Sequence, residues 1–491
     1  MKPIFLAAII VSTVSRGIGA VALPSIFSDH MVVQHGVPLR IWGTADPDES
    51  VSVHVGETLI GATRADAAGR WVVTGGPQRP GALPDIVIRG TNTVTLKDVL
   101  AGEVWLCAGQ SNMQMTVSPT PKCEYGGVIN ERAEVADASH PQIRFFDKQW
   151  EACSPETVGR ASAVAYFFGR ALQRELKVPV GLVTKAFGGT VVEYWLAPAS
   201  WTKELTDKAV SAYVPFYQYR QQIHDQQVAK LQQAGAGNRP AAKPLAPPTK
   251  PEQYPQRFSK LFRDHLAPIA GYPIAGVLWY QGESNTPRSG AYQELLTALI
   301  EGWRTEWGNP GLPFVIVQLA DFATRETQGQ GAENWPVLRD IQARVAEAVP
   351  RTALVVTLGA GDPELLHPRN KQEVGRRAAL RVLEEFYERN LLSKGPVLKS
   401  VAFQSGEVVL EFSGATEGMH VEGAEGLAME IAGADRVFRA ANSRIEGSTV
   451  HLSGVENSRP RWVRYAWAGY PRGLLMNREG LAAAPFEREI P

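Results

Sequence analysis

The pattern of apolar and polar positions changes along this chain of 491 residues. Residues 23–100 consist of short runs in which apolar and polar residues alternate, separated by Gly, Pro, Asp and Asn. Examples are 38–42, 51–55 and 93–96. Alternation with a period of two predicts strands, and several short strands with turn residues between them favour a small β-sandwich. We therefore expect an N-terminal β-sandwich domain over 23–100.

Residues 101–395 have a different texture, in which short continuous apolar runs alternate with segments of helical period. The apolar runs predict buried parallel strands at 104–107, 180–184, 274–279, 314–318 and 353–358. The helical segments are 158–176, 290–306, 336–348 and 369–391. Strands and helices in alternation predict an α/β fold, with a doubly wound parallel sheet covered by helices.

Two further stretches depart from this alternation. Residues 213–232 predict a Gln-rich helix, and the proline-rich residues that follow predict an extended linker, so we interpret 200–255 as an insertion in the α/β domain. A surface loop without function is the more common outcome for such a segment, and a lid over a site is the alternative. Residues 396–491 return to short β-prone runs and predict a C-terminal β-rich region.

The N-terminus has the pattern of a secretory signal peptide. Lys2 precedes an apolar run at 4–14, and the small residues at 20–22 form a cleavage site. We expect residues 1–22 to be removed and the mature protein to be exported, periplasmic or secreted. The formal net charge is zero, without blocks of like charge, so neither a nucleic acid nor a membrane surface is an expected partner.

The cysteines and histidines do not have the spacing of a metal site, and we expect no metal and no cofactor. Cys107 lies in a predicted strand and is expected in the core. Cys123 and Cys153 are able to form a disulfide in an oxidising compartment, although sequence does not supply the geometry.

Ser111 is the candidate nucleophile. The apolar run before it stops at Gly109, which places the serine at the carboxyl end of a strand, where open α/β sheets build their sites. Backbone N–H groups at the start of a helix are also able to bind an oxyanion there. A serine in this position is equally able to serve as a helix cap.

His367 is the candidate general base. It lies in a loop, and Pro368 after it suits the first turn of a helix. Asp362 and Glu364 precede it closely, and an imidazole with a carboxylate is the pair that a serine needs to become a nucleophile. The other histidines lack a comparable setting.

Four segments in this order carry a resemblance to a known family: 109–113 (Gly-Gln-Ser-Asn-Met), 187–190 (Phe-Gly-Gly-Thr), 279–285 (Trp-Tyr-Gln-Gly-Glu-Ser-Asn) and 367–372 (His-Pro-Arg-Asn-Lys-Gln). The chain resembles the sialate O-acetylesterase-type members of the SGNH hydrolase superfamily over nearly its whole length. The resemblance implies a flavodoxin-like three-layer α/β/α hydrolase domain over 101–395 with flanking β domains. It also implies an acetyl-enzyme on the serine and an O-acetylated sugar as substrate.

The resemblance also implies an oxyanion hole. Its donors would be the N–H of Ser111, an N–H of Gly188 or Gly189, and the side chain of Gln281 or Asn285, with Gln281 favoured. The acid of the triad is Asp362 or Glu364, with Asp362 slightly favoured. A backbone carbonyl in place of a carboxylate is a third alternative.

The motifs leave several functions open. The substrate is acetylated sialic acid or an acetylated plant polysaccharide such as xylan or xyloglucan, because the motifs address only the acetyl end. A catalytically dead glycan-binding module is another alternative. An α/β-hydrolase is disfavoured because Met113 stands where the nucleophile elbow needs glycine. A glycosidase is disfavoured because no second acid matches Glu283 in quality. The oligomeric state is not readable.

Overall fold

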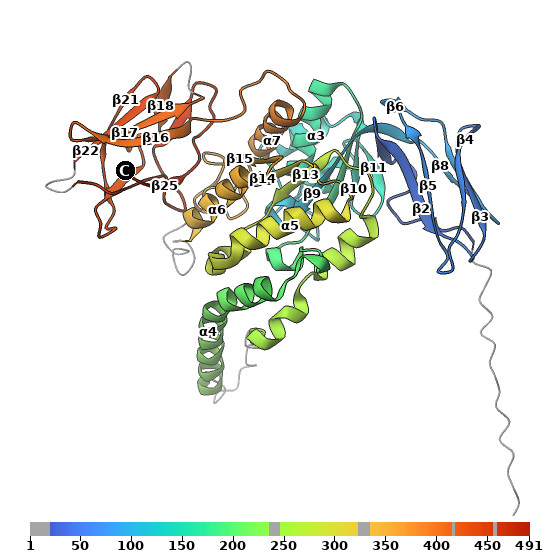
Figure 1. The fold of residues 1–491 in the computed structure, drawn as a ribbon, viewed down its shortest axis with the longest axis horizontal. Helices are drawn as coiled ribbons and strands as arrows, with labels where there is room; N and C mark the ends of the chain where they lie inside the picture. The colour runs from blue at the N-terminus through green and yellow to red at the C-terminus, as the bar shows by residue number, and fades with distance from the viewer. Residues whose placement is uncertain (1–19, 235–245, 323–333, 415–417, 455–458) are drawn as a thin grey trace, which may run out of the picture.

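The computed structural model describes residues 20–234, 246–322, 334–414, 418–454 and 459–491. Figure 1 shows a central α/β layer with a β region at each end, N-terminal on one side and C-terminal on the other. The predicted signal residues before Ala20 and the predicted linker residues 235–245 lie outside the described part. No helix in that part combines the length and the apolar character that a membrane crossing requires.

The central sheet is built around β9 (Leu100–Gly109), which is buried along its whole length. The strand order is β11-β10-β12-β9-β13-β14-β15, and neighbours run parallel except β10 and β11. The other strands are β10 (His140–Phe146), β11 (Trp150–Cys153), β12 (Val180–Ala186), β13 (Gly276–Tyr280), β14 (Phe314–Val317) and β15 (Thr352–Val355). All five predicted strands are confirmed, whereas β10 and β11 were not predicted.

Helices cover both faces of this sheet because successive side chains of each strand point to opposite sides. Val104, Leu106 and Ala108 of β9 pack in one core, with α5 (Tyr292–Glu306) and α6 (Trp335–Ala348). Trp105 and Cys107 pack in the other core, with α3 (Ala163–Leu176) and α7 (Lys371–Phe386). The four predicted helices are confirmed, and the three-layer α/β/α architecture with them.

The N-terminal strands form two small sheets and two additions to the central sheet. The sheets are β2 (Pro38–Thr44) with β5 (Arg70–Pro77), and β4 (Thr58–Arg64), β3 (Ser50–Val55), β7 (Ile86–Arg89) and β8 (Thr93–Leu96) in that order. The three predicted strands cited above correspond to β2, β3 and β8. Both β1 (Val32–Gln34) and β6 (Gly81–Ala82) pair with β9, so this region is hydrogen-bonded directly to the central sheet.

The C-terminal region is also formed by strands. Two sheets have the orders β16-β17-β22-β21 and β20-β19-β23-β25, and β18 pairs with β24. The strands are β16 (Val397–Gln404), β17 (Glu407–Ser413), β18 (Met419–Glu422), β19 (Met429–Ala432), β20 (Arg439–Ala440), β21 (Asn442–Glu446), β22 (Thr449–Ser453), β23 (Trp462–Tyr465), β24 (Leu474–Asn477) and β25 (Phe486–Glu489).

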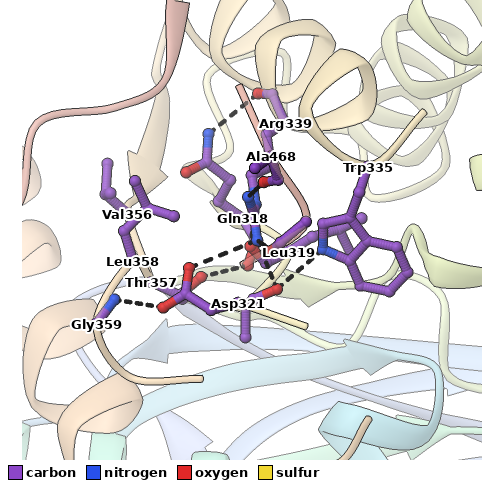
Figure 2. A network of polar contacts seen from close by, with 12 residues as sticks. Gln318, Leu319, Asp321, Trp335, Arg339, Val356, Thr357, Leu358, Gly359 and Ala468 are labelled. Atoms are coloured by element: carbon purple, nitrogen blue, oxygen red, sulfur yellow. Dashed lines mark hydrogen bonds and ion pairs between the residues drawn. The ribbon is translucent and has the colours of Figure 1, made fainter. Parts of the chain in front are cut away.

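A buried ion pair links this C-terminal region to the central domain (Figure 2). Arg339 of α6 lies 3.5 Å from Asp321 and donates to the carbonyl oxygens of Leu319, Ala320, Ala468 and Gly469. The Asp321 carboxylate accepts a 2.5 Å hydrogen bond from the N–H of Gly359, at the start of the loop that carries His367. The network therefore anchors the end of β14, the loop after β15 and the C-terminal region to one another.

The insertion contains α4 (Lys203–Ala234), a long helix that projects from the body in Figure 1. It includes the predicted helix 213–232. The remaining helices are short: α1 (Ser111–Gln114), α2 (Glu131–Ala136), the 3-10 segments η1 (Val158–Arg160), η2 (Val192–Tyr194), η3 (Pro198–Ser200), η4 (Pro251–Arg257), η6 (Ala267–Ile269) and η7 (Glu283–Ala291), and the π-helical η5 (Phe262–Leu266).

All three cysteines are free and buried, so the structure does not contain the disulfide considered for Cys123 and Cys153. Cys153 ends β11, and its thiol donates to the carbonyl of Ala138 instead. Burial raises the pKa of the Cys153 thiol to about 12, which makes it unreactive. Cys107 lies in β9 within the core, as predicted.

Candidate active site

Three strands of the central sheet end in register. Gly109 of β9 pairs with Ala186 of β12 on one side and with Tyr280 of β13 on the other. Because the strands are parallel, the segments that follow them emerge side by side at one edge of the sheet. These segments contain Ser111, the pair Gly188 and Gly189, and Gln281, so the fold brings together three motifs that lie far apart in the sequence.

Gly109 allows the chain to leave the sheet sharply at this edge. Its φ is 147°, and a Cβ would lie only 2.1 Å from the carbonyl oxygen of Tyr280. Ser111 follows as the first residue of α1 and is 6% exposed. Beside it, the side-chain oxygen of Gln110 accepts from the N–H groups of Gly282 and Ser284, each at 3.3 Å. The nucleophile segment is thus fixed to the segment after β13.

His367 reaches the same place from the loop between β15 and α7. The residue before it, Leu366, accepts a 3.1 Å hydrogen bond from the side chain of Asn112, next to the serine. The imidazole ring of His367 stacks on the Tyr125 ring with a centroid separation of 4.1 Å. The Tyr125 hydroxyl in turn donates a hydrogen bond to the side chain of Gln114 in α1 at 2.8 Å. The structure therefore places Ser111 and His367 in one neighbourhood.

The imidazole is in the form that a general base requires. Burial, followed by the charge of Lys371, lowers the pKa of His367 to about 4, so the ring is neutral at pH 7. Its Nε2 is buried and has no hydrogen-bond partner in the described part of the chain. Catalytic hydrogen bonds are often long in structures without substrate. A neutral ring with an unoccupied nitrogen is able to accept a proton.

Neither candidate acid contacts the imidazole within the described residues. Asp362 accepts from the N–H groups of Glu364 and Leu365 at 2.8 and 3.0 Å, so its carboxylate closes a turn just before the histidine. Glu364 is exposed to solvent. The group that orients His367 is therefore one of three: the Asp362 carboxylate, the Glu364 carboxylate or a backbone carbonyl oxygen.

Gly188 lies beside the nucleophile. A Cβ placed on it would be 3.4 Å from the Cβ of Ser111 and 3.0 Å from the side-chain oxygen of Gln114. That oxygen accepts the Gly188 N–H at 2.8 Å. A substrate oxyanion would have to replace Gln114 at this donor. Gly189 has a φ of 69°, and a Cβ placed on it would meet no atom within 4 Å among the described residues other than its neighbours in the chain.

The amides of Gln281 and Asn285 are both engaged with the protein. The side-chain nitrogen of Gln281 donates to Gln110, to the carbonyl of Thr190 and to the Asn285 oxygen, at 3.2, 3.1 and 2.8 Å. The Asn285 nitrogen donates to Glu193 at 3.0 Å. In this conformation both amides connect the segments behind the nucleophile, and an N–H of Gln281 would reach an oxyanion only by exchanging a partner.

Four polar residues in this neighbourhood were not predicted from the sequence as part of the site: Asn112, Gln114, Tyr125 and Lys371. Asn112, Gln114 and Lys371 lie within or directly beside the quoted motifs, and this position was the only sign in the sequence that they belong to the site. Their contacts depend on partners far away in the chain, because Lys371 donates to Asn112 across 259 positions. Glu283, a buried partner of Asn112, was considered from the sequence, either as a site acid or as a brace of its loop.

A family model described as "Carbohydrate esterase, sialic acid-specific acetylesterase" matches residues 101–232 and 249–384. The chain belongs to this family. It is an ester hydrolase of the carbohydrate esterase type, and the resemblance inferred from the motifs is confirmed. The match covers the strands, the loops and the helix that carry the residues described above.

Individual relatives agree with the family. The chain is 28% identical to mouse sialate O-acetylesterase over 84% of this chain and 82% of the relative. It is 27% identical to the human sialate O-acetylesterase over 79% and 75%. The crystal structure of a carbohydrate acetylesterase from Xanthomonas citri has a TM-score of 0.78 and 28% identity, covering 96% of this chain and 99% of that one. The expected fold is therefore confirmed over nearly the full length.

Proposed function

We propose that this protein is a serine esterase that removes O-acetyl groups from a carbohydrate, with Ser111 as nucleophile and His367 as general base. The observation that carries this proposal is the convergence of the two residues at one edge of the sheet. They come from distant segments, and a hydrogen bond joins the residues next to them, Asn112 and Leu366. A free serine needs such a base because its hydroxyl is a weak nucleophile at neutral pH.

The mechanism follows from these roles. His367 takes the hydroxyl proton through Nε2 as the Ser111 oxygen attacks the acetyl carbonyl. The tetrahedral oxyanion is met by the N–H of Ser111, by an N–H of Gly188 or Gly189, and by Gln281 or Asn285. His367 then protonates the departing sugar hydroxyl. Water repeats the sequence on the acetyl-enzyme and releases acetate. Asp362 or Glu364 orients the imidazole in this scheme, with Asp362 favoured.

We assign O-acetylated sialic acid as the first substrate to test, because the matched family model and the mammalian relatives are named for acetylesterases of sialic acid. Acetylated xylan and xyloglucan are the second candidates, since the Xanthomonas citri structure is named only as a carbohydrate acetylesterase. Acetate release from O-acetylated sialic acid, measured beside acetylated xylan and xyloglucan oligosaccharides, distinguishes the two classes.

Substitution of the serine tests the proposal. Ser111→Ala is expected to reduce kcat by about a millionfold, with an unchanged melting temperature, since the other parts of a triad contribute little once the nucleophile is lost. Ser118→Ala is the matched control, because Ser118 is a half-buried serine outside the site, and it is expected to retain normal turnover. Near-normal acetate release by Ser111→Ala would reject the mechanism. A wild-type protein that binds glycans without releasing acetate would instead support the binding-module alternative.

A further inference from the structure

Three buried polar side chains meet between the catalytic segments. The nitrogen of the Asn112 side chain donates to Glu283 Oε1 at 2.5 Å, and its oxygen accepts from Lys371 Nζ at 2.7 Å. The same nitrogen donates to the carbonyl of Leu366. Asn112 follows the nucleophile, Leu366 precedes the base, and Glu283 lies in the segment after β13. One amide therefore connects all three segments of the proposed site.

This cluster lies deep in the protein. Lys371 is 0% exposed, Asn112 2% and Glu283 8%. Burial lowers the pKa of Lys371 to about 7 and raises the pKa of Glu283, with each group partly offsetting the shift of the other. Glu283 Oε2 has no hydrogen-bond partner in the described part of the chain. Apolar residues of similar volume would often give an equally stable fold, so stability alone does not account for charged groups at this point.

We propose that Asn112, Glu283 and Lys371 form a positioning network, in which Lys371 holds the His367 loop against the Ser111 helix. This inference rests on the proposed roles of Ser111 and His367. The role of Lys371 in this network needs no contact of this residue with the substrate or the reacting atoms. It acts through Asn112, which it orients, and through its charge. Misplacement of a reacting pair by about 1 Å can cost about a hundredfold in rate.

The groups that face the two titrating side chains are few. The Lys371 ammonium is near Glu283, the Cys123 thiol and the Tyr280 ring, whose centroid is 5.7 Å away. His367 faces Tyr125 and Lys371, and the carboxylates of Asp362 and Glu364 belong to its own loop. With a pKa of about 7, Lys371 is fully charged in the acid range where His367 titrates. Its charge therefore opposes protonation of the base at that pH.

The test is Lys371→Met, which keeps the length of the side chain and removes its charge. Lys185→Met is the matched control, because Lys185 is also a buried lysine with a lowered pKa but is hydrogen-bonded to the carbonyl of Asp147. We expect Lys371→Met to lower kcat about a hundredfold with little change in KM. We expect the acid limb of its kcat/KM profile to move upward by about half a pH unit or more. Lys185→Met is expected to leave the acid limb in place.

A double variant keeps the test valid if Lys371→Met alone does not fold. Lys371→Met alone leaves the Glu283 carboxylate buried without its cation, which can destabilise the fold. E283Q/K371M removes both charges and leaves a neutral acceptor for Asn112. It should regain stability yet keep the low kcat and the displaced acid limb. Wild-type kcat and an unmoved acid limb in folded Lys371→Met or in the double variant would overturn the network, even when Ser111→Ala is inactive. An active Ser111→Ala would overturn the proposed function instead.

Discussion

Two buried charge clusters lie at the carboxyl edge of the same sheet, and they differ in what they contact. The Asp321 and Arg339 pair bonds to backbone: Arg339 donates to four carbonyl oxygens, and Asp321 accepts from the N–H of Gly359 (Figure 2). The cluster of Asn112, Glu283 and Lys371 instead connects side chains of the motif segments beside Ser111 and His367. Although both clusters are buried, one bonds mainly to backbone groups and the other to side chains beside the proposed catalytic residues.

The difference indicates which cluster matters for stability and which for catalysis. The backbone carbonyls bonded to Arg339 belong to two segments far apart in the chain, so the pair braces the fold. The other cluster bonds to the segments that carry Ser111 and His367, and this location separates the two, since both clusters hold a carboxylate oxygen without a hydrogen-bond partner in the described residues. We therefore expect substitutions in the two clusters to have separable effects.

After Ser111, the largest effect on kcat is expected at the base, His367. His367→Ala should lower kcat by about 10⁴-fold or more, because the serine then has no proton acceptor. The melting temperature near pH 7 should change little, since the ring is only partly buried. Acetate release and thermal unfolding on the same preparation check both points. Comparable activity in the variant and the wild type would remove His367 from the mechanism.

Arg339→Met should have the opposite effect, a large loss of stability with little change in kcat. Loss of the guanidinium leaves Asp321 buried and uncompensated, so the free energy of unfolding should fall by about 3–5 kcal/mol. Well below the melting temperature, kcat should change by less than about tenfold. Denaturant unfolding and steady-state kinetics measure the two quantities. A variant of normal stability with a collapsed kcat would show that the two clusters are not separable.

The acid limb of the kcat/KM profile should lie at a lower pH than the ordinary pKa of histidine. Because the pKa of His367 is lowered from 6.5 to about 4, kcat/KM should stay nearly level from pH 7 to about 5 and fall as the pH approaches 4. For stability, the unfolded chain takes up this proton near pH 6.5 and the folded chain only near 4. The contribution of His367 to stability is therefore complete above pH 6.5 and declines as the pH falls toward 4. An acid limb near pH 6.5 would contradict the desolvated environment.

The smallest effect is expected at Gly188. A Cβ there meets the movable end of Gln114 at 3.0 Å and the Ser111 Cβ at an ordinary 3.4 Å. Gly188→Ala should therefore fold and lose less than about tenfold in kcat/KM. Gly109→Ala is the contrasting variant, since its Cβ would collide with the backbone of Tyr280, and it should fail to accumulate as folded protein. Soluble yield and kcat/KM of both variants test the difference.

Much of the fold was predictable because its signals are local. Apolar runs and helical periodicity identified five consecutive strands of the central sheet, from β12 to β15 in the sheet order, and the four covering helices. Both β10 and β11 were missed, and in β10 the buried run begins only at Ile143, after the half-buried His140 and the exposed Pro141 and Gln142. The meeting of Ser111 and His367 followed from the rule that sites form at the carboxyl ends of parallel strands.

The finer design of the site was not predictable. Asn112 and Glu283 bond across 171 positions, and nothing in either segment alone indicates that contact. Gln281 or Asn285, with Gln281 favoured, was expected to face an oxyanion, whereas the two amides are engaged with Thr190 and Glu193. Such partners are set by the packing of loops around the sheet. A motif identifies the type of chemistry, but the hydrogen-bond partners come from the tertiary structure.

Covalent labelling of the nucleophile tests the central claim most directly. The native protein is treated with a fluorophosphonate, which reacts with activated serines, and peptide mapping by mass spectrometry locates the adduct. We predict one adduct, on Ser111, formed in step with the loss of acetate release, and sharply slowed in His367→Ala because the serine then lacks its base. Complete inactivation with the adduct on another residue, or full labelling of Ser111 without loss of activity, would contradict the account.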